Sequence, residues 1–216
     1  MKKIAVILSG CGFLDGSEIH ESILTLLALD ANKAKSYCFA LDELQNTVVN
    51  HTNNKQKKQQ RNQMEESARI SRGEIFSLST IDANNLDGLI IPGGFGIIRN
   101  LCDFEINGSK CKINKNLIKI IKNMHQLKKP LGLMCIAPVI IPKILNIPIK
   151  LTIGNDKKII SEIKKMGAIH IECAVDNIIV DEDNLIVTTP AYMLTKSIFE
   201  INNGISKLVK KILEMI

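Results

Sequence analysis

The stretch Leu131-Gly-Leu-Met-Cys-Ile-Ala-Pro138 decides the fold. Its first half is short and apolar, which is typical of a buried β-strand, and Pro138 can open a helix because its missing N–H is not needed there. Cys135 therefore lies at a strand-to-helix turn, where the N–H groups of the new helix point toward its side chain. The pattern predicts a reactive thiol; the alternative is a core cysteine, because free cysteine is among the most buried residue types.

Strands and helices alternate on both sides of this stretch. Strands are predicted at 3–9, 35–40, 86–91, 131–135, 149–153, 169–174, 177–180 and 185–189. Helices are predicted after residue 17 and at 62–72, 113–128, 138–145, 157–166 and 192–216. Apolar strands that alternate with helices indicate a mainly parallel sheet covered on both faces. We therefore expect a single three-layer α/β domain over residues 1–216, with a small hairpin near Asp181–Asn184.

Local signals refine the ends and faces of these elements. Ser17 is a natural cap for the first helix, and its apolar stripe is predicted to consist of Ile19, Ile23, Leu24, Leu26 and Leu27. The polar stretch 41–63 is interpreted as a solvated surface insertion, which places His51 at the surface. The last helix is expected to break near Asn203-Gly204.

Composition excludes several classes of protein. The net charge of +6 comes from 28 basic and 22 acidic residues, but Ile, Lys and Asn are all over-represented, so the basic balance reflects coding bias more than a polyanion partner. With 4% aromatic residues and no Trp, stacking platforms for nucleic acid are scarce. No apolar run approaches the roughly 18 residues of a membrane span. We expect no nucleic-acid and no membrane partner.

The six cysteines are expected to be reduced thiols in a cytoplasmic protein, because the N-terminus lacks the apolar run of a secretory signal. Zinc-type Cys and His spacings are missing from the sequence, so we expect no metal and no cofactor.

Three loops leave the carboxyl ends of predicted strands, which is where ligands bind in such sheets. They are residues 10–18, 92–96 and 135–138. Gly93 and Gly94 can present N–H groups to a ligand, and the N–H of Ile136 is a natural oxyanion donor beside Cys135. The helix N-terminus is expected to lower the pKa of the Cys135 thiol. Glu18, if it reaches Cys135, would orient the thiol and share its proton.

Five motifs in order resemble a known family. They are Ser9-Gly-Cys-Gly12, Asp15-Gly-Ser-Glu-Ile-His20, Ile91-Pro-Gly-Gly-Phe-Gly96, Met134-Cys-Ile-Ala-Pro138 and Thr188-Thr-Pro-Ala-Tyr192. Together they resemble the ElbB-type glyoxalases, a branch of the PfpI-like, class I glutamine amidotransferase-like superfamily. The resemblance implies a flavodoxin-like sandwich and a homodimer. It also implies a link to isoprenoid production, Cys135 as the nucleophile, Glu18 as its contact and Gly93-Gly94 as the oxyanion loop.

One departure from the superfamily pattern bears on chemistry. Many members place His directly after the nucleophile, and here that residue is Ile136. Hydrolysis of an amide is then disfavoured, because the thiol lacks an imidazole to activate it and to protonate a poor leaving group. Addition to a small dicarbonyl needs no leaving group. We expect Cys135 to form a hemithioacetal with glyoxal or methylglyoxal, and Glu18 or His20 to shuttle a proton before the 2-hydroxy acid is released.

Other functions use the same residues. A deglycase would reverse adducts of the same aldehydes on amines. A redox-sensing protein would oxidise Cys135, with Cys11 at a neighbouring strand end as a resolving thiol. An amidotransferase-like partner subunit that has lost its base is a further alternative.

Overall fold

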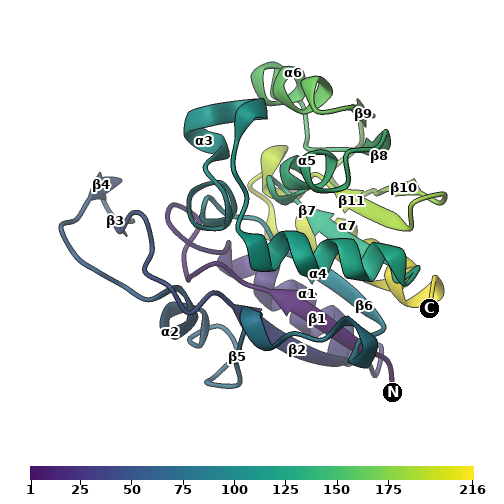
Figure 1. Cartoon of the computed structure of the whole chain (residues 1–216), viewed down its shortest axis with the longest axis horizontal. Helices are drawn as coiled ribbons and strands as arrows, with labels where there is room; N and C mark the ends of the chain where they lie inside the picture. The colour runs from purple at the N-terminus through teal and green to yellow at the C-terminus, as the bar shows by residue number, and fades with distance from the viewer.

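A mainly parallel, seven-stranded sheet forms the centre of the computed structural model, which describes all residues from 1 to 216 (Figure 1). In spatial order its strands are β10 (Ile179–Asp181), β11 (Ile186–Thr189), β7 (Leu131–Met134), β6 (Gly88–Ile91), β1 (Lys3–Ile7), β2 (Lys35–Ala40) and β5 (Phe76–Ser77). Every pairing is parallel except that of β10 with β11. The predicted fold class, including the hairpin, is confirmed.

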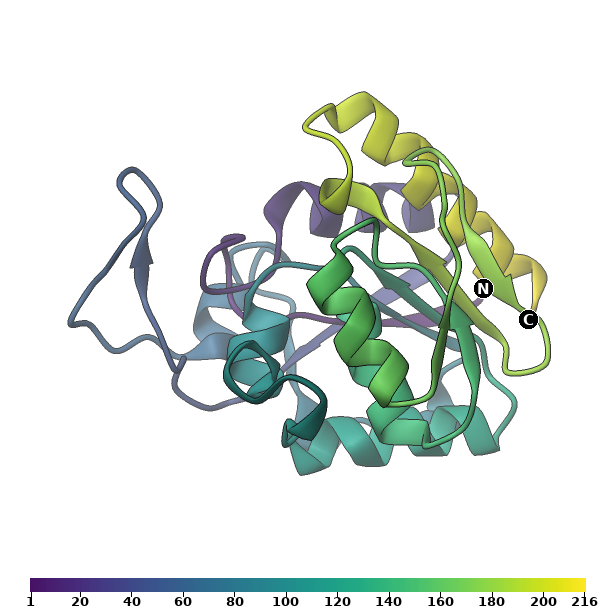
Figure 2. The same cartoon turned by 90° about the horizontal axis from the view of Figure 1, so that it is seen from above.

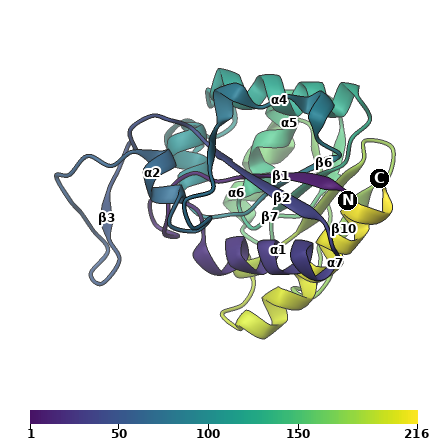
Figure 3. The ribbon, with the colours of Figure 1, turned by 90° about the horizontal axis from the view of Figure 1, so that it is seen from below.

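Helices cover both faces of the sheet. α1 (Ile19–Ala31) and α7 (Ile198–Glu214) lie side by side on one face, and α4 (Lys115–Gln126) and α5 (Ile141–Leu145) lie on the other (Figure 3). Central strands are therefore apolar at every position, as β6 and β7 are, because neither of their faces meets water. No helix combines the length and apolar character needed to cross a membrane.

The face that α1 buries differs from the predicted stripe. Ile19, Ile23 and Leu27 are 42%, 44% and 56% exposed. The buried positions are mostly small or polar: Glu21, Ser22, Thr25, Ala28 and Leu29. Ser22 and Thr25 donate their hydroxyls to carbonyls four residues earlier, so burying them leaves no unpaired group.

The cap of α1 was also predicted wrongly. Glu18, not Ser17, is the N-cap, and its Oε2 accepts the N–H of Glu21 at 2.7 Å. Ser17 points inward instead, where its Oγ accepts the N–H of Ser9 at 2.9 Å. The short side chain of Ser17 therefore joins the two ends of the loop between β1 and α1.

The terminal helix α7 continues through Gly204, contrary to the expected break. A Cβ at this position would lie 2.5 Å from the carbonyl oxygen of Val175 and 2.7 Å from Thr189 Oγ1. The glycine thus allows close packing of α7 against the chain before β10 and against β11. The gain from that contact outweighs the weak helix propensity of glycine.

Smaller elements lie around this core. They are α2 (Gln63–Ser67), α3 (Phe104–Asn107) and α6 (Lys157–Lys165), the parallel pair β8 (Ile149–Leu151) and β9 (Ala168–His170), and the antiparallel pair β3 (Val49–Asn50) and β4 (Lys55–Gln56). The predicted strands near 149–153 and 169–174 thus pair with each other outside the main sheet. The insertion that carries β3 and β4 projects from the body as an arm (Figure 2).

Candidate active site

Cys135 follows β7 directly and adopts a left-handed backbone conformation, with φ of +58°. Non-glycine residues rarely adopt this conformation, and it persists only where the surroundings impose it. Its N–H donates to the carbonyl oxygen of Thr189, at the end of β11, over 3.0 Å. The side chain is only 7% exposed. The fold thus holds the thiol at a strained strand-to-helix turn, as Leu131–Pro138 predicts.

The carboxylate next to this thiol belongs to Glu21. Its side chain is completely buried, within hydrogen-bonding reach of the Cys135 thiol. The N–H of Gly93 donates to its Oε2 at 2.8 Å, and the N–H of Tyr192 donates to its Oε1 at 3.3 Å. Backbone groups from two loops therefore fix the carboxyl beside the sulfur.

Glu18, the residue expected to pair with the thiol, lies one helical turn earlier and caps α1. Its side chain is turned toward the backbone of the first turn, whereas Glu21 is on the face of α1 that is buried. The sequence Ser17-Glu-Ile-His-Glu21 holds the missed signal: an N-cap acid is followed three residues later by a second acid that the helix directs inward.

The two glutamates have different electrostatic surroundings. Burial and the nearby charge of Glu18 raise the pKa of Glu21 to about 8. Burial also raises the pKa of Glu18, and the backbone hydrogen bonds that Glu18 accepts only partly offset this rise. Burial and the negative charge of Glu21 raise the pKa of the Cys135 thiol well above its ordinary value. The expectation of a lowered thiol pKa is therefore wrong: removal from water outweighs the helix N-terminus.

Backbone N–H groups still surround the sulfur. Those of Ile136 and Gly94 donate to Cys135 Sγ. Gly93 and Gly94 lie at the end of β6, and their lack of side chains allows the approach. A Cβ on Gly93 would overlap Cys135 and come within 2.6 Å of Glu21 Oε2. The predicted oxyanion groups of Gly94 and Ile136 thus lie beside Cys135, whereas the N–H of Gly93 is bound to Glu21.

A cavity of about 470 Å³ opens above the thiol. Its lining consists of Phe13, Glu18, His20, Gly94, Phe95, Cys135, Ile136, Tyr192, Met193, Thr195 and Lys196. His20 Nδ1 lies 2.5 Å from the hydroxyl of Tyr192 and 4.0 Å from Glu18 Oε1. His20 and Glu18 therefore face the cavity together with Tyr192, a residue for which sequence reasoning assigned no role.

Cys11 is not among the residues that line this cavity. Burial and the charge of Glu66 raise the pKa of its thiol, and its other charged neighbours are Arg69, Asp15 and Arg61. Its surroundings are thus the side of the molecule near α2. The cavity above Cys135 is therefore lined without a second thiol.

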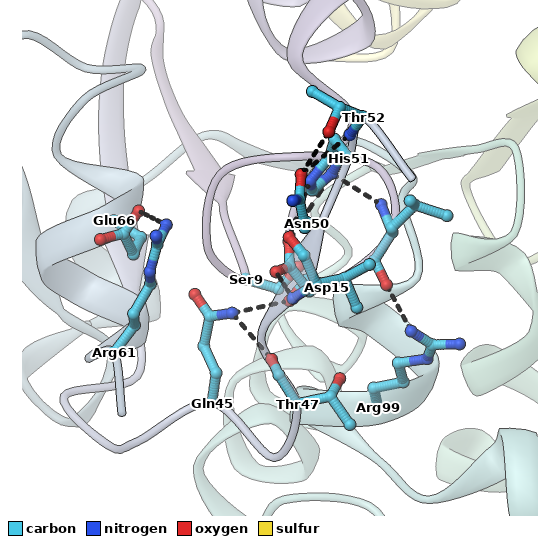
Figure 4. Close-up of polar contacts among 12 residues, drawn as sticks. Ser9, Asp15, Gln45, Thr47, Asn50, His51, Thr52, Arg61, Glu66 and Arg99 are labelled. Atoms are coloured by element: carbon cyan, nitrogen blue, oxygen red, sulfur yellow. Dashed lines mark hydrogen bonds and ion pairs between the residues drawn. The ribbon is translucent and has the colours of Figure 1, made fainter. Parts of the chain in front are cut away.

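The polar insertion, by contrast, contacts the site loop (Figure 4). His51 Nε2 accepts the N–H of Leu14 at 3.3 Å, and Asp15 Oδ2 accepts the N–H of Val49 at 2.6 Å. The Asp15 carbonyl oxygen also accepts from the side chain of Gln45 at 3.1 Å. Residues 10–16 are therefore bound along one side by the base of the arm, so the interpretation of 41–63 as a merely solvated insertion is incomplete.

Comparisons with known proteins assign the family. No family model matches the chain. The ES1 protein homolog, mitochondrial, of Rattus norvegicus is 40% identical over 99% of this chain and 84% of its own length. Glutamine amidotransferase-like class 1 domain-containing protein 3, mitochondrial, of Homo sapiens is also 40% identical, over 99% of this chain and 83% of its own length. The chain belongs to the ES1 family of glutamine amidotransferase-like class 1 proteins.

A solved structure agrees with this assignment. An isoprenoid biosynthesis protein with amidotransferase-like domain from Ehrlichia chaffeensis has a TM-score of 0.94 and 33% identity, covering 100% of this chain and 99% of its own. Drosophila melanogaster DJ-1β, at 14% identity and a TM-score of 0.58 over 99% of this chain and 95% of its own, shares the fold. The superfamily expected from the five motifs is therefore correct, while the comparisons support ES1 and glutamine amidotransferase-like relatives and not the ElbB-type glyoxalases.

The comparisons overturn the expected location. Both curated relatives, and the ES1 protein of Danio rerio at 33% identity over 98% of this chain and 85% of its own length, are named as mitochondrial. The inference of a cytoplasmic protein, drawn from reduced cysteines and the N-terminus, is wrong. Reduced thiols are compatible with more than one compartment, so they could not distinguish them.

Proposed function

We propose that this ES1-family protein is a cofactor-independent glyoxalase that converts an α-oxoaldehyde to the 2-hydroxy acid. The observation that carries the proposal is the buried pair of Cys135 and Glu21 beneath a cavity, with two backbone N–H groups on the sulfur. A thiol whose own pKa is high needs a base at the moment of attack. A carboxyl with a pKa near neutrality is matched to that task.

The steps conserve atoms and electrons. Glu21 takes the thiol proton as Sγ attacks the aldehyde carbon, and the resulting oxyanion is protonated to the hemithioacetal. The hydrogen on that carbon then moves to the neighbouring carbonyl carbon through an enediol, which oxidises the first carbon and reduces the second. Water hydrolyses the thioester that results, releasing the 2-hydroxy acid and restoring the thiol. Glu18, His20 and Tyr192 line the cavity and are the groups proposed to move this second proton.

The deglycase alternative uses the same groups and differs only in the substrate. The redox-sensor alternative has weaker support, because a sensor thiol is expected to have a low pKa and to be accessible. Burial raises the pKa of Cys135, and Cys11 does not line the cavity above it. We also propose a homodimer, for which the exposed residues Ile19, Ile23 and Leu27 on α1 are the supporting observation.

The test compares glyoxal consumption by the wild type, Cys135→Ser and Cys11→Ser. Cys135→Ser is expected to reduce kcat/KM by at least about a thousandfold, because a serine hydroxyl gives up its proton far less readily than a thiol and is a weaker nucleophile. Cys11→Ser is the matched control and should retain turnover within about twofold. Full turnover by Cys135→Ser would refute the proposal.

A further inference from the structure

The cavity above Cys135 is larger and more apolar than a two-carbon dicarbonyl requires. Its volume of about 470 Å³ falls within the range of about 300–1,000 Å³ that holds drug-sized ligands. Phe13, Phe95, Ile136, Tyr192 and Met193 contribute apolar lining. Glyoxal offers these side chains no hydrophobic group to bury. The following inference rests on the proposed function and concerns the group that its substrate carries.

Both phenylalanines are held in place by a second side chain. The imidazole of His51 packs edge-on against Phe13, with ring centroids 5.5 Å apart and planes at 76°. The guanidinium of Arg99 lies over Phe95, 5.1 Å from its centroid. Such aromatic and cation–π contacts favour one ring position over others. The structure thus fixes the positions of both aromatic rings at the site, although Phe13 itself is 48% exposed.

His51 and Arg99 are themselves hydrogen-bonded to the loop that carries Phe13 (Figure 4). Arg99 Nη1 donates to the carbonyl oxygen of Leu14 at 2.5 Å and also pairs with Glu105. His51 Nδ1 lies 3.2 Å from the carbonyl oxygen of Val49, and its Nε2 accepts from Leu14. His51 therefore donates through Nδ1 and accepts through Nε2, which fixes its ring orientation. The arm therefore does not line the cavity itself but holds one of its lining residues, Phe13, through this histidine.

We propose that the substrate is an α-oxoaldehyde whose second carbonyl carries an aromatic or bulky apolar group. The aldehyde carbon reaches Cys135, and the apolar group lies against Phe13, Phe95 and Met193. The balance of the reaction is unchanged, because the apolar group takes no part in bond making or breaking. The product is the corresponding 2-hydroxy acid. His51 acts as a positioning residue, through Phe13, and does not touch the reacting atoms.

Kinetics with phenylglyoxal and glyoxal test the inference. The wild type is expected to show a kcat/KM at least about tenfold higher for phenylglyoxal, since even one methylene in a hydrophobic pocket discriminates by about 10- to 200-fold. Phe13→Ala should lower the phenylglyoxal-to-glyoxal ratio about tenfold. Phe76→Ala is the matched control: Phe76 is 49% exposed but belongs to β5, away from the cavity, and its loss should leave the ratio unchanged.

His51→Ala separates positioning from a general loss of stability. The variant should raise KM for phenylglyoxal several-fold while kcat changes less than twofold, because the wall and not the thiol is disturbed. Equal losses of kcat for both substrates would contradict the positioning role. A wild-type ratio near or below one would overturn the inference while leaving the proposed glyoxalase activity intact.

Protection of the thiol gives a readout that needs no turnover. Iodoacetamide labelling of Cys135, followed by peptide mass, is compared in the presence of mandelate and of glycolate. Mandelate should slow labelling at a concentration at least about tenfold lower than glycolate. Equal protection would count against an apolar subsite. Protection by mandelate in a protein that turns over neither aldehyde would support the subsite and refute the proposed function.

Discussion

At the scale of single residues, Glu18 and Glu21 show how burial assigns different roles to identical side chains. Glu18 caps α1 and faces the cavity, while Glu21 is enclosed beside Cys135 and bound by two backbone N–H groups. Their charges are close enough that Glu18 raises the pKa of Glu21. The base proposed for the reaction is therefore tuned by a neighbour as well as by its own burial.

This coupling predicts a pH profile. Glu21 accepts the thiol proton only when ionised, so kcat/KM should rise with pH through about 8. Glu18→Gln keeps an oxygen for the cap but removes the charge that raises the pKa of Glu21, so the rising limb should move to lower pH. Glu21→Gln should reduce kcat/KM by about 10²- to 10⁴-fold.

Glu65→Gln, on the exposed surface of α2, is the control for loss of one negative charge and should leave the profile in place. The measurement is kcat/KM for the wild type and each variant from pH 6 to 9.5. A Glu18→Gln profile that moves to higher pH would show that the assigned base is wrong.

Glu21 also makes stability depend on pH. Its pKa is about 8 in the folded protein against an ordinary value of 4.5, so between these values the folded state binds more protons than the unfolded state. Stability due to this group is fully present below pH 4.5 and is lost as the pH rises through about 8. The change amounts to at most about 5 kcal/mol.

Glu21→Gln should remove this contribution. Urea unfolding at pH 5 and pH 8.5 is expected to show a larger loss of unfolding free energy with pH in the wild type than in the variant. Parallel losses in the two proteins would mean that Glu21 is already ionised at neutral pH.

At the scale of elements, the loop after β6 and the turn after β7 fit together only because Gly93 has no side chain. Gly93→Ala would force its Cβ into Cys135 and against Glu21 Oε2. We expect this substitution to reduce kcat/KM at least about a hundredfold, because a displacement of even 1 Å at a reacting group costs that much. Gly73→Ala has space for the methyl group but strains a backbone with φ of +88°, so it controls for a general loss of stability away from the site.

Near-UV circular dichroism and the melting temperature of both variants would separate local misplacement from unfolding. A Gly93→Ala protein with unchanged turnover would show that the contact between the two loops is not needed for activity.

At the scale of the whole molecule, α1 has an unusual division of faces. Small and polar residues are buried, while Ile19, Ile23 and Leu27 form an exposed stripe at four-residue spacing. Exposed apolar patches of this kind mark interaction surfaces. The stripe supports the proposed homodimer.

Sedimentation equilibrium tests this proposal. The wild type is expected to sediment as a dimer, and Ile23→Lys should weaken association at least about tenfold by placing a charge within the contact. Lys119→Ala, on α4 at the opposite face of the sheet, is the control. A monomeric wild type at concentrations up to about 100 μM would rule out a stable dimer.

The sequence by itself determined the alternation of strands and helices and the position of Cys135 between them. Hydrophobic runs, glycine and proline are local signals, so β1, β6, β7 and the hairpin could be predicted from them. The peripheral strands could not be predicted as well. β8 and β9 pair outside the main sheet, and the sequence of β5 has no pattern that predicts a strand. Those strands depend on pairing with distant partners.

Only the tertiary structure decided which groups meet at the site. Glu21 and not Glu18 lies beside Cys135, His51 of the arm holds Phe13, and α1 exposes the stripe that periodicity assigned to the core. Each outcome depends on what packs against a given face, which is a property of the assembled layers. Burial also reverses the expected shift of the thiol pKa, because desolvation is set by the whole surrounding structure and not by neighbours in sequence.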